Sequence, residues 1–147
     1  MANSGSNQKS QPAAVGITLE QAQAVVGAAR MKAEQIGVPM NIAVVDAGGN
    51  LAAFAKMDGA WLGSIDIAIN KAYTARAFDM TTEALGELSQ PGAMIYGIHA
   101  SNDLRIIIFG GGIPLQQGTN IIGAIGVSGG SVPQDIEVAE AGTSVIG

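Results

Sequence analysis

Cysteine is absent from this sequence, and histidine occurs once among its 147 residues, as His99. Without cysteine the chain cannot form a disulfide, a zinc–thiolate site, an iron–sulfur cluster or a thiol nucleophile. A single histidine likewise excludes a cage of several histidines around a metal within one chain. The side chains left for catalysis are therefore those of Asp, Glu, Lys, Ser, Thr, Tyr and His99.

Positive charge is also scarce, with seven basic residues against 12 acidic ones, a formal net charge of −5 and an isoelectric point near 4.6. A nucleic-acid partner needs a basic face, so none is expected. Long apolar runs are missing too, because Gly, Pro, Asn and Asp interrupt every stretch before the roughly 18 residues that a membrane span needs. No membrane partner is expected either.

What the chain does have is apolar surface: 48% of its residues are hydrophobic, only 13% are charged, and the mean hydropathy is +0.32. This composition excludes a disordered protein, and the length predicts one domain. The surplus of apolar residues predicts contacts between copies of the chain, and so a homo-oligomer.

The first 16 residues differ from the rest, since they are rich in Asn, Ser, Gln and Ala. They lack the apolar segment of a signal peptide, which predicts a disordered leader over 1–16, a domain over 17–147 and a cytoplasmic location.

Four helices are predicted from capping residues followed by apolar residues at helical spacing. They start at Thr18, Ser64, Thr81 and Ser131, and the last one is expected to close at Gly142. Two hairpins are predicted between them: residues 41–46 with 51–57, and residues 105–109 with 120–127, with the glycine-rich stretch 110–114 outside regular structure. Hairpins separated by helices predict an α/β (α+β) fold with an antiparallel sheet covered by helices.

Five blocks of sequence resemble one known family in order and spacing. The blocks are Val45-Asp46-Ala47-Gly48-Gly49-Asn50-Leu51, Met57-Asp58-Gly59-Ala60, Lys71-Ala72-Tyr73-Thr74-Ala75, Phe109-Gly110-Gly111-Gly112-Ile113-Pro114 and Gly123-Ala124-Ile125-Gly126-Val127-Ser128-Gly129-Gly130. They resemble the GlcG/HbpS family, also called the haem-degrading or DUF336 family, which includes the C-terminal domain of some PduO proteins. The resemblance implies a single profilin-like domain with helices on both faces of its sheet. It also implies closed oligomers, often octamers, and haem or corrinoid binding in some members.

His99 is the one side chain suited to bind haem iron near neutral pH. No motif assigns it as the family's haem ligand, and three other interpretations stay open. It is a loop histidine bound to a backbone carbonyl, a general base that orients a polar substrate, or half of a bis-histidyl site shared between two chains.

Lys71 and two arginines are further candidates. A lysine beside apolar surface can lose its charge and act as a base or nucleophile, but the favoured interpretation of Lys71 is a solvated surface residue paired with an acidic neighbour. Arg76 and Arg105 can each hold a carboxylate in a bidentate fork, which suits haem propionates and small organic acids equally.

Gly110, Gly111 and Gly112 match neither a Walker loop nor a dinucleotide fingerprint. Their backbone N–H groups are candidates to bind an anion or a carbonyl oxygen, although a tight turn explains such a triplet as well. Trp61 and Tyr96 are candidates to stack on a flat ligand, or to serve as core or interface anchors.

Two functions follow as hypotheses. The first is a binding protein that holds haem, another tetrapyrrole or a related small molecule near His99, Lys71 and the glycine triplet. The second is a cofactor-free lyase, isomerase or hydrolase acting on a small organic acid or aromatic catabolite, with His99 or Lys71 as the acid/base.

Overall fold

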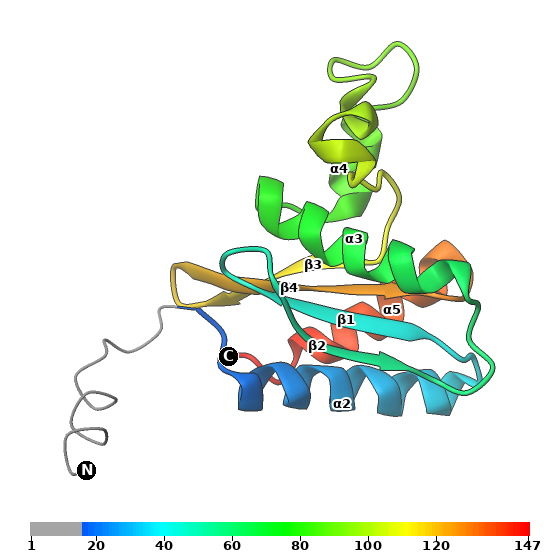
Figure 1. The fold of residues 1–147 in the computed structure, drawn as a ribbon, viewed down its shortest axis with the longest axis vertical. Helices are drawn as coiled ribbons and strands as arrows, with labels where there is room; N and C mark the ends of the chain where they lie inside the picture. The colour runs from blue at the N-terminus through cyan, green and yellow to red at the C-terminus, as the bar shows by residue number, and fades with distance from the viewer. Residues whose placement is uncertain (1–15) are drawn as a thin grey trace, which may run out of the picture.

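The structure, a computed structural model, describes residues 16–147, so nearly all of the predicted leader lies outside it. Figure 1 shows two pairs of strands separated by α3 and α4, with α2 before the first pair and α5 after the second. Their order is α2 (Leu19–Ile36), β1 (Asn41–Asp46), β2 (Leu51–Lys56), α3 (Gly63–Phe78), α4 (Thr82–Leu88), β3 (Gly112–Gln117), β4 (Asn120–Ser128) and α5 (Val132–Thr143). Two short 3-10 turns, Ile98–Ala100 and Asn102–Leu104, lie between α4 and β3.

The four strands form one antiparallel sheet in the order β2-β1-β4-β3, so the two hairpins join through β1 and β4. Helix α3 covers one face of this sheet, and α2 and α5 lie together on the other (Figure 1). The predicted α/β fold, with an antiparallel sheet between helical layers, is confirmed.

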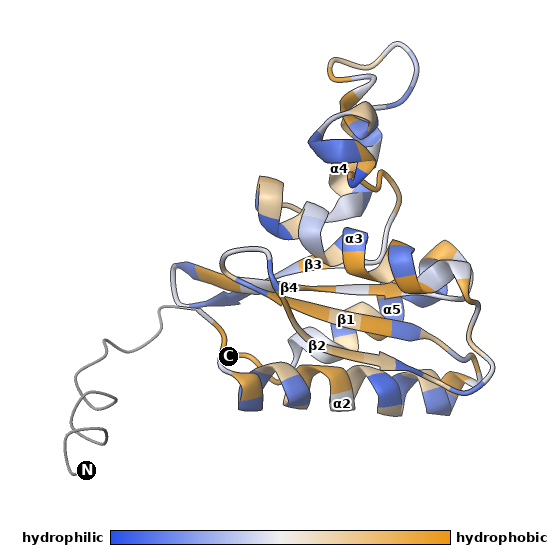
Figure 2. Cartoon of the chain, in the orientation of Figure 1, coloured by the Kyte–Doolittle hydropathy of each residue, from blue (hydrophilic) through white to orange (hydrophobic). Residues whose placement is uncertain are grey.

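The two faces of the sheet are packed differently. The face under α2 and α5 buries large apolar side chains, among them Val25, Ile42, Leu115 and Ile125, and α2 is banded orange and blue in Figure 2 as an amphipathic helix is. The face under α3 buries mainly alanines, Ala43, Ala68, Ala72, Ala75 and Ala124. Small residues let the backbone of α3 approach β4 closely, which decides what the longer side chains of α3 can reach.

Most of the predicted helix starts are confirmed. Thr18 and Ser131 each form a complete capping box, and Thr81 caps α4 through the amide of Ala84. The predicted cap at Ser64 is wrong, because α3 already begins at Gly63 and has no side-chain cap. Gly142 does not close α5 either. It is buried inside the helix, where a Cβ atom would press on Ile125.

The predicted strand at residues 105–109 is wrong. This apolar run is an extended connector alongside α3, and its backbone bonds to a side chain instead of a neighbouring strand. Thr74 Oγ1 accepts from the Ile107 amide at 3.0 Å and donates to the Arg105 carbonyl at 3.3 Å. Ile106 of this run is buried, but Phe109 is 42% exposed, so burial accounts for only part of the apolar composition that resembles a strand.

The strand expected at residues 105–109 is replaced by β3, which begins inside the glycine-rich stretch. Pro114 lies within this strand, opposite Ala124 of β4. A proline is tolerated there because β3 is an edge strand and needs hydrogen bonds on one side only.

Residues 89–105 project away from the sheet, at the top of Figure 1. Asn102, Asp103 and Leu104 are three consecutive residues with φ between 53° and 63°. Tyr73 OH donates to Asn102 Oδ1 at 2.9 Å and ties this segment to α3. Within residues 16–147, no helix has both the length and the apolar character that crossing a membrane requires.

Candidate functional site

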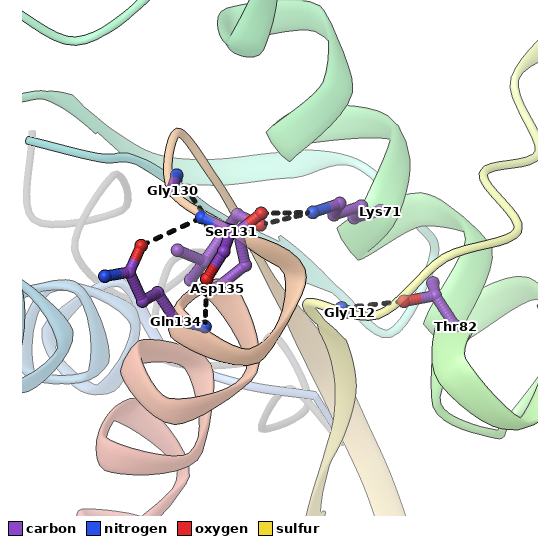
Figure 3. A network of polar contacts seen from close by, with 8 residues as sticks. Lys71, Thr82, Gly112, Gly130, Ser131, Gln134 and Asp135 are labelled. Carbon is purple, nitrogen blue, oxygen red and sulfur yellow. Dashed lines mark hydrogen bonds and ion pairs between the residues drawn. The ribbon is translucent and has the colours of Figure 1, made fainter. Parts of the chain in front are cut away.

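A buried ion pair joins the two helical layers of the domain. Lys71 Nζ, reaching from α3, lies 2.9 Å from Asp135 Oδ2 in the first turn of α5 and donates to the Val127 carbonyl at 2.8 Å (Figure 3). The side chains of Lys71 and Asp135 are 0% and 4% exposed. The Phe109 ring covers the ammonium, with its centroid 4.9 Å from Nζ.

The interpretation of Lys71 as a solvated surface residue is therefore wrong. Helical spacing placed Lys71 off the alanine face of α3, and the sequence gives no distance between α3 and the loop before α5. Because α3 packs closely on β4, the lysine stem passes the end of that strand and reaches Asp135.

Burial shifts the pKa values of both groups in the direction that favours their neutral forms. Desolvation lowers the pKa of Lys71, while the charge and hydrogen bond of Asp135 oppose that shift. Desolvation raises the pKa of Asp135, against the opposing effects of the Lys71 charge and the backbone N–H groups of Gly130 and Gly129. Each charge is thus held in the interior by the other.

The surrounding backbone fits closely around the pair. Gly130 N–H donates to Asp135 Oδ1 at 2.9 Å, and Ser131 and Gln134 close the start of α5 by their capping box (Figure 3). Gly111 has φ +126°, and a Cβ atom there would lie 2.7 Å from Lys71 Nζ. Glycine at this position is therefore required both by the backbone conformation and by the lysine.

A pocket of about 400 Å³ opens beside this ion pair, between the start of α3 and the start of α5. Its lining residues are Trp61, Gly63, Ser64, Ile67, Phe109, Ser128, Gly129, Gly130, Val132 and Asp135. Trp61 is 71% exposed, whereas Ser64, Ser128 and Asp135 are buried. The pocket thus combines an aromatic rim with polar groups that are largely withdrawn from solvent.

Four polar residues of this region are absent from the sequence predictions as site residues. Ser64, Ser128 and Asp135 line the pocket, and Asn41 holds its rim, because Asn41 Nδ2 donates to the Trp61 carbonyl at 2.9 Å. Asn41 and Ser128 are paired across β1 and β4. The available signal was a polar residue at the end of an otherwise apolar strand, and strand ends carry polar residues for many other reasons.

The structure places His99 and Tyr96 on the projecting segment 89–105, and neither lines the pocket beside Asp135. Both side chains are exposed, and their rings meet edge to face with centroids 6.1 Å apart. The imidazole makes no hydrogen bond within residues 16–147, so the interpretation of His99 as a loop histidine bound to a carbonyl is wrong for this conformation. The predicted cleft that unites His99 with Lys71 is not formed by the described residues.

Both arginines lie near Tyr73. Arg105 stacks on the Tyr73 ring at 3.6 Å and donates to Asn70 Oδ1 at 3.3 Å. Arg76 donates to Asp79 Oδ1 at 2.6 Å and, with Tyr73, lines a hollow of about 240 Å³ beside the β1–β2 turn. Carboxylate binding by either arginine stays a prediction.

The glycine triplet is buried. Gly112 N–H donates to Thr82 Oγ1 at 2.9 Å (Figure 3), and the Gly111 carbonyl accepts from Val127 N–H at 2.9 Å. A Cβ atom at Gly110 would overlap the Ile136 side chain. The triplet therefore serves close packing around Lys71, and ligand binding by its amides stays a prediction.

A larger hollow of about 480 Å³ lies between the end of α2 and β2. All four of its charged lining residues, Arg30, Glu34, Lys56 and Asp58, are exposed, so no buried polar group points to a ligand there. Among the residues that the structure describes, no three His, Asp or Glu side chains gather closely enough to hold a metal ion.

Comparison with known proteins connects this geometry to a family. The model of the family described as "Haem degrading protein HbpS-like" matches residues 17–144. The chain belongs to the HbpS-like family. The recognition made from the five sequence blocks is thereby confirmed.

Several relatives of this HbpS-like chain are similar over most of its length. A 15.0 kDa protein of Citrobacter freundii from the dhaT–dhaS intergenic region is 46% identical over 84% of this chain and 87% of its own. The crystal structure of Klebsiella pneumoniae ORFY has a TM-score of 0.87 and 42% identity, covering 93% of this chain and 94% of that one. A PduOC:haem complex has a TM-score of 0.86 and 35% identity, covering 90% and 96%.

The full-length corrinoid adenosyltransferase PduO of Citrobacter freundii is 36% identical to this HbpS-like chain over 90% of the chain, but over only 40% of PduO. The chain therefore spans less than half of that relative.

Proposed function

We propose that this protein binds haem or a related tetrapyrrole. The observation that supports the proposal most directly is the likeness to PduOC, a relative of 35% identity that was crystallised as a haem complex. Within this chain, His99 supplies an imidazole that is exposed and free of hydrogen bonds within residues 16–147. Such a group fits the axial position of a haem iron.

The segment around His99 fits the rest of a macrocycle as well. Met94, Tyr96 and Leu104 are 85%, 62% and 73% exposed on the same projecting segment, and they offer apolar surface to a flat ring. Arg105 follows at the base of the segment and is our candidate partner for a propionate, as is Arg76, which lines a hollow together with Tyr73. Bound haem would supply a metal centre and a strong Soret band.

Haem titration tests this proposal. The purified protein should shift the Soret band of haem saturably, with one site per chain. Because His99 is the sole histidine, His99→Ala removes every imidazole, and we expect it to abolish the shift or weaken binding at least roughly tenfold. Met94→Leu is the matched control, since it removes the thioether of the segment, which is another side chain there that can bind haem iron, and should leave the band unchanged.

The outcomes separate the two parts of the proposal. Absence of a saturable shift in the unmodified protein contradicts haem binding altogether. An identical band in His99→Ala contradicts only the assignment of the iron ligand.

We also propose that the chain assembles into a homo-oligomer, for which an octamer is the number that the family resemblance suggests. Large apolar side chains that a monomer leaves in solvent support assembly, including Trp61 at 71%, Leu62 at 80% and Leu104 at 73% exposure. The cytoplasmic location stays a prediction from the sequence and is checked by cell fractionation.

The enzyme hypothesis stays a prediction for which no described contact provides support. His99 and Lys71 do not share a pocket, and Lys71 Nζ is enclosed by Asp135, Val127 and Phe109. A substrate has no path to that amine in this conformation.

A further inference from the structure

We propose that the pocket beside Asp135 is a second ligand site, distinct from the His99 segment, and that it takes a small uncharged ring bearing a hydroxyl group, of the phenol class. The pocket is the space of about 400 Å³ lined by Trp61, Ser64, Phe109 and Ser128 together with Asp135. Small-molecule sites span roughly 300–1,000 Å³, so this one, near the lower end, suits a single ring better than a macrocycle.

The apolar part of the pocket is suited to a flat ring. Trp61 and Phe109 contribute aromatic surfaces, and Ile67 and Val132 contribute aliphatic ones. Aromatic rings in contact gain from offset or edge-to-face packing beyond the burial of area. The main chain at Trp61 is held in place by the buried Asn41 amide, so the aromatic rim is anchored at its base.

The polar part of the pocket has unused hydrogen-bonding capacity. Ser64 and Ser128 are only 8% and 4% exposed as residues, and neither hydroxyl makes a hydrogen bond within residues 16–147, but their oxygens stay accessible to solvent from the pocket. When a ligand displaces water from such a hydroxyl, the hydroxyl needs a new partner that both donates and accepts. A ligand hydroxyl meets that requirement, whereas a bare hydrocarbon does not.

The charges around the pocket select against an anion. Asp135 is the ionisable residue that lines it, and its carboxylate already accepts from Gly130 N–H and from Lys71. In the loop just before α5, Gly130 N–H is thus occupied by the protein's own acid, and Ser131 N–H is occupied by Gln134. With Lys71 and Asp135 neutralising each other, an uncharged ligand is favoured over a carboxylate.

Phenol is the probe for this site, and Trp61 is the reporter because it is the sole tryptophan of the chain. Titration of the full-length protein, with excitation at the red edge of indole absorption, should change the Trp61 emission saturably with a Kd on the order of 1 mM. In two-dimensional amide spectra, the largest shifts should fall at Ser128 and Gly129. Benzoate, which carries a charge, and toluene, which lacks the hydroxyl, should each bind at least roughly fivefold more weakly.

Serine variants test the polar contacts. The double variant Ser64→Ala/Ser128→Ala should weaken phenol binding roughly tenfold while the thermal transition stays cooperative. Ser144→Ala, at the exposed end of α5, is the matched control and should bind phenol as the unmodified protein does. His99→Ala should also bind phenol normally, because it lies on the other site.

Three results would overturn the proposal. They are the lack of a saturable response to phenol at about ten times the expected Kd, benzoate or toluene binding as tightly as phenol, and unchanged phenol affinity in a folded double serine variant. Haem titration of that variant keeps the two proposals apart, since its Soret shift should be unaffected whatever phenol does.

Discussion

At the scale of single residues, the feature that defines this protein is a charged pair inside a core built from alanine and glycine. Lys71 and Asp135 are both buried, and each has the other as its countercharge. A buried pair of this kind adds little net stability, but removing one partner leaves a charge with no compensation. The pair is therefore sensitive to substitution, and its sensitivity depends on pH.

Lys71→Met should reduce the free energy of unfolding at pH 7 by about 3–5 kcal/mol, because Asp135 then stays buried as an unpaired carboxylate. Burial already raises the pKa of Asp135, and loss of the Lys71 charge, which opposes that shift, raises it further. The folded variant consequently binds a proton that the unfolded chain does not, so its stability should rise as the pH falls toward the ordinary Asp value of 3.8. Urea unfolding at pH 7 and pH 5 measures both effects.

Lys32→Met is the matched control for this substitution. Lys32 lies 3.2 Å from Glu137, but the two side chains are 33% and 47% exposed, so the cost should be below about 1 kcal/mol. Equal losses in the two variants, or a fall in the relative stability of Lys71→Met on acidification, would show that the ion pair is not buried as described.

At the scale of elements, the contact between α3 and β4 determines the site. Gly126 of β4 lies directly beneath α3, and a Cβ atom there would overlap the backbone at Ala68 and Ala72. The backbone of a helix cannot move to make room for an added atom as a flexible side chain can. The absence of a side chain at Gly126 therefore sets the distance at which Lys71 passes the end of the strand.

Gly126→Ala should destabilise the fold by about 1–3 kcal/mol, because α3 must shift away from the sheet. Gly27→Ala is the opposite case, since Gly27 lies inside α2 with no atom within 4 Å of the added Cβ. That variant should gain up to about 1 kcal/mol from better helix propensity. Thermal and urea unfolding of the two variants, measured side by side, check both predictions. An unchanged free energy of unfolding in Gly126→Ala would mean that α3 is not held against β4.

At the scale of the whole molecule, apolar groups remain on the surface after the core is complete. Several of them lie at the start of α3 and on the segment 89–105, which projects away from the sheet in Figure 1. The proposed haem surface and the rim of the pocket beside Asp135 both belong to these regions. An assembly that covers this surface would therefore also cover parts of both proposed sites.

The assembly proposal predicts a mass well above the 14.8 kDa of one chain in sedimentation at micromolar concentration. Leu62→Asp and Leu104→Asp each place a charge on an exposed apolar group and should shift the distribution toward smaller species. Thr119→Asp, in the exposed β3–β4 turn, adds the same charge away from these regions and should not. A monomer in the unmodified protein would contradict the proposal, as would equal masses in all three variants.

Much of the fold follows from local signals. The capping boxes at Thr18 and Ser131 and the first hairpin depend on interactions between residues close in the chain, so the sequence predicts them. The α/β class follows from the order of helices and hairpins along the chain. The prediction of a strand at 105–109 failed because an apolar composition indicates burial without identifying the neighbouring segment. Here the neighbour is Thr74 of α3, about thirty positions away in the chain.

The sequence by itself determined what chemistry is excluded: with no cysteine and one histidine, any site must be built from other side chains or from His99 alone. It also determined the family, through blocks whose order does not depend on folding. Only the tertiary structure decided that Lys71 is buried against Asp135, that two unpartnered serine hydroxyls face a common pocket, and that His99 lies elsewhere. These are contacts between residues as much as 64 positions apart, set by how closely α3 can approach the sheet, and no local pattern encodes that distance.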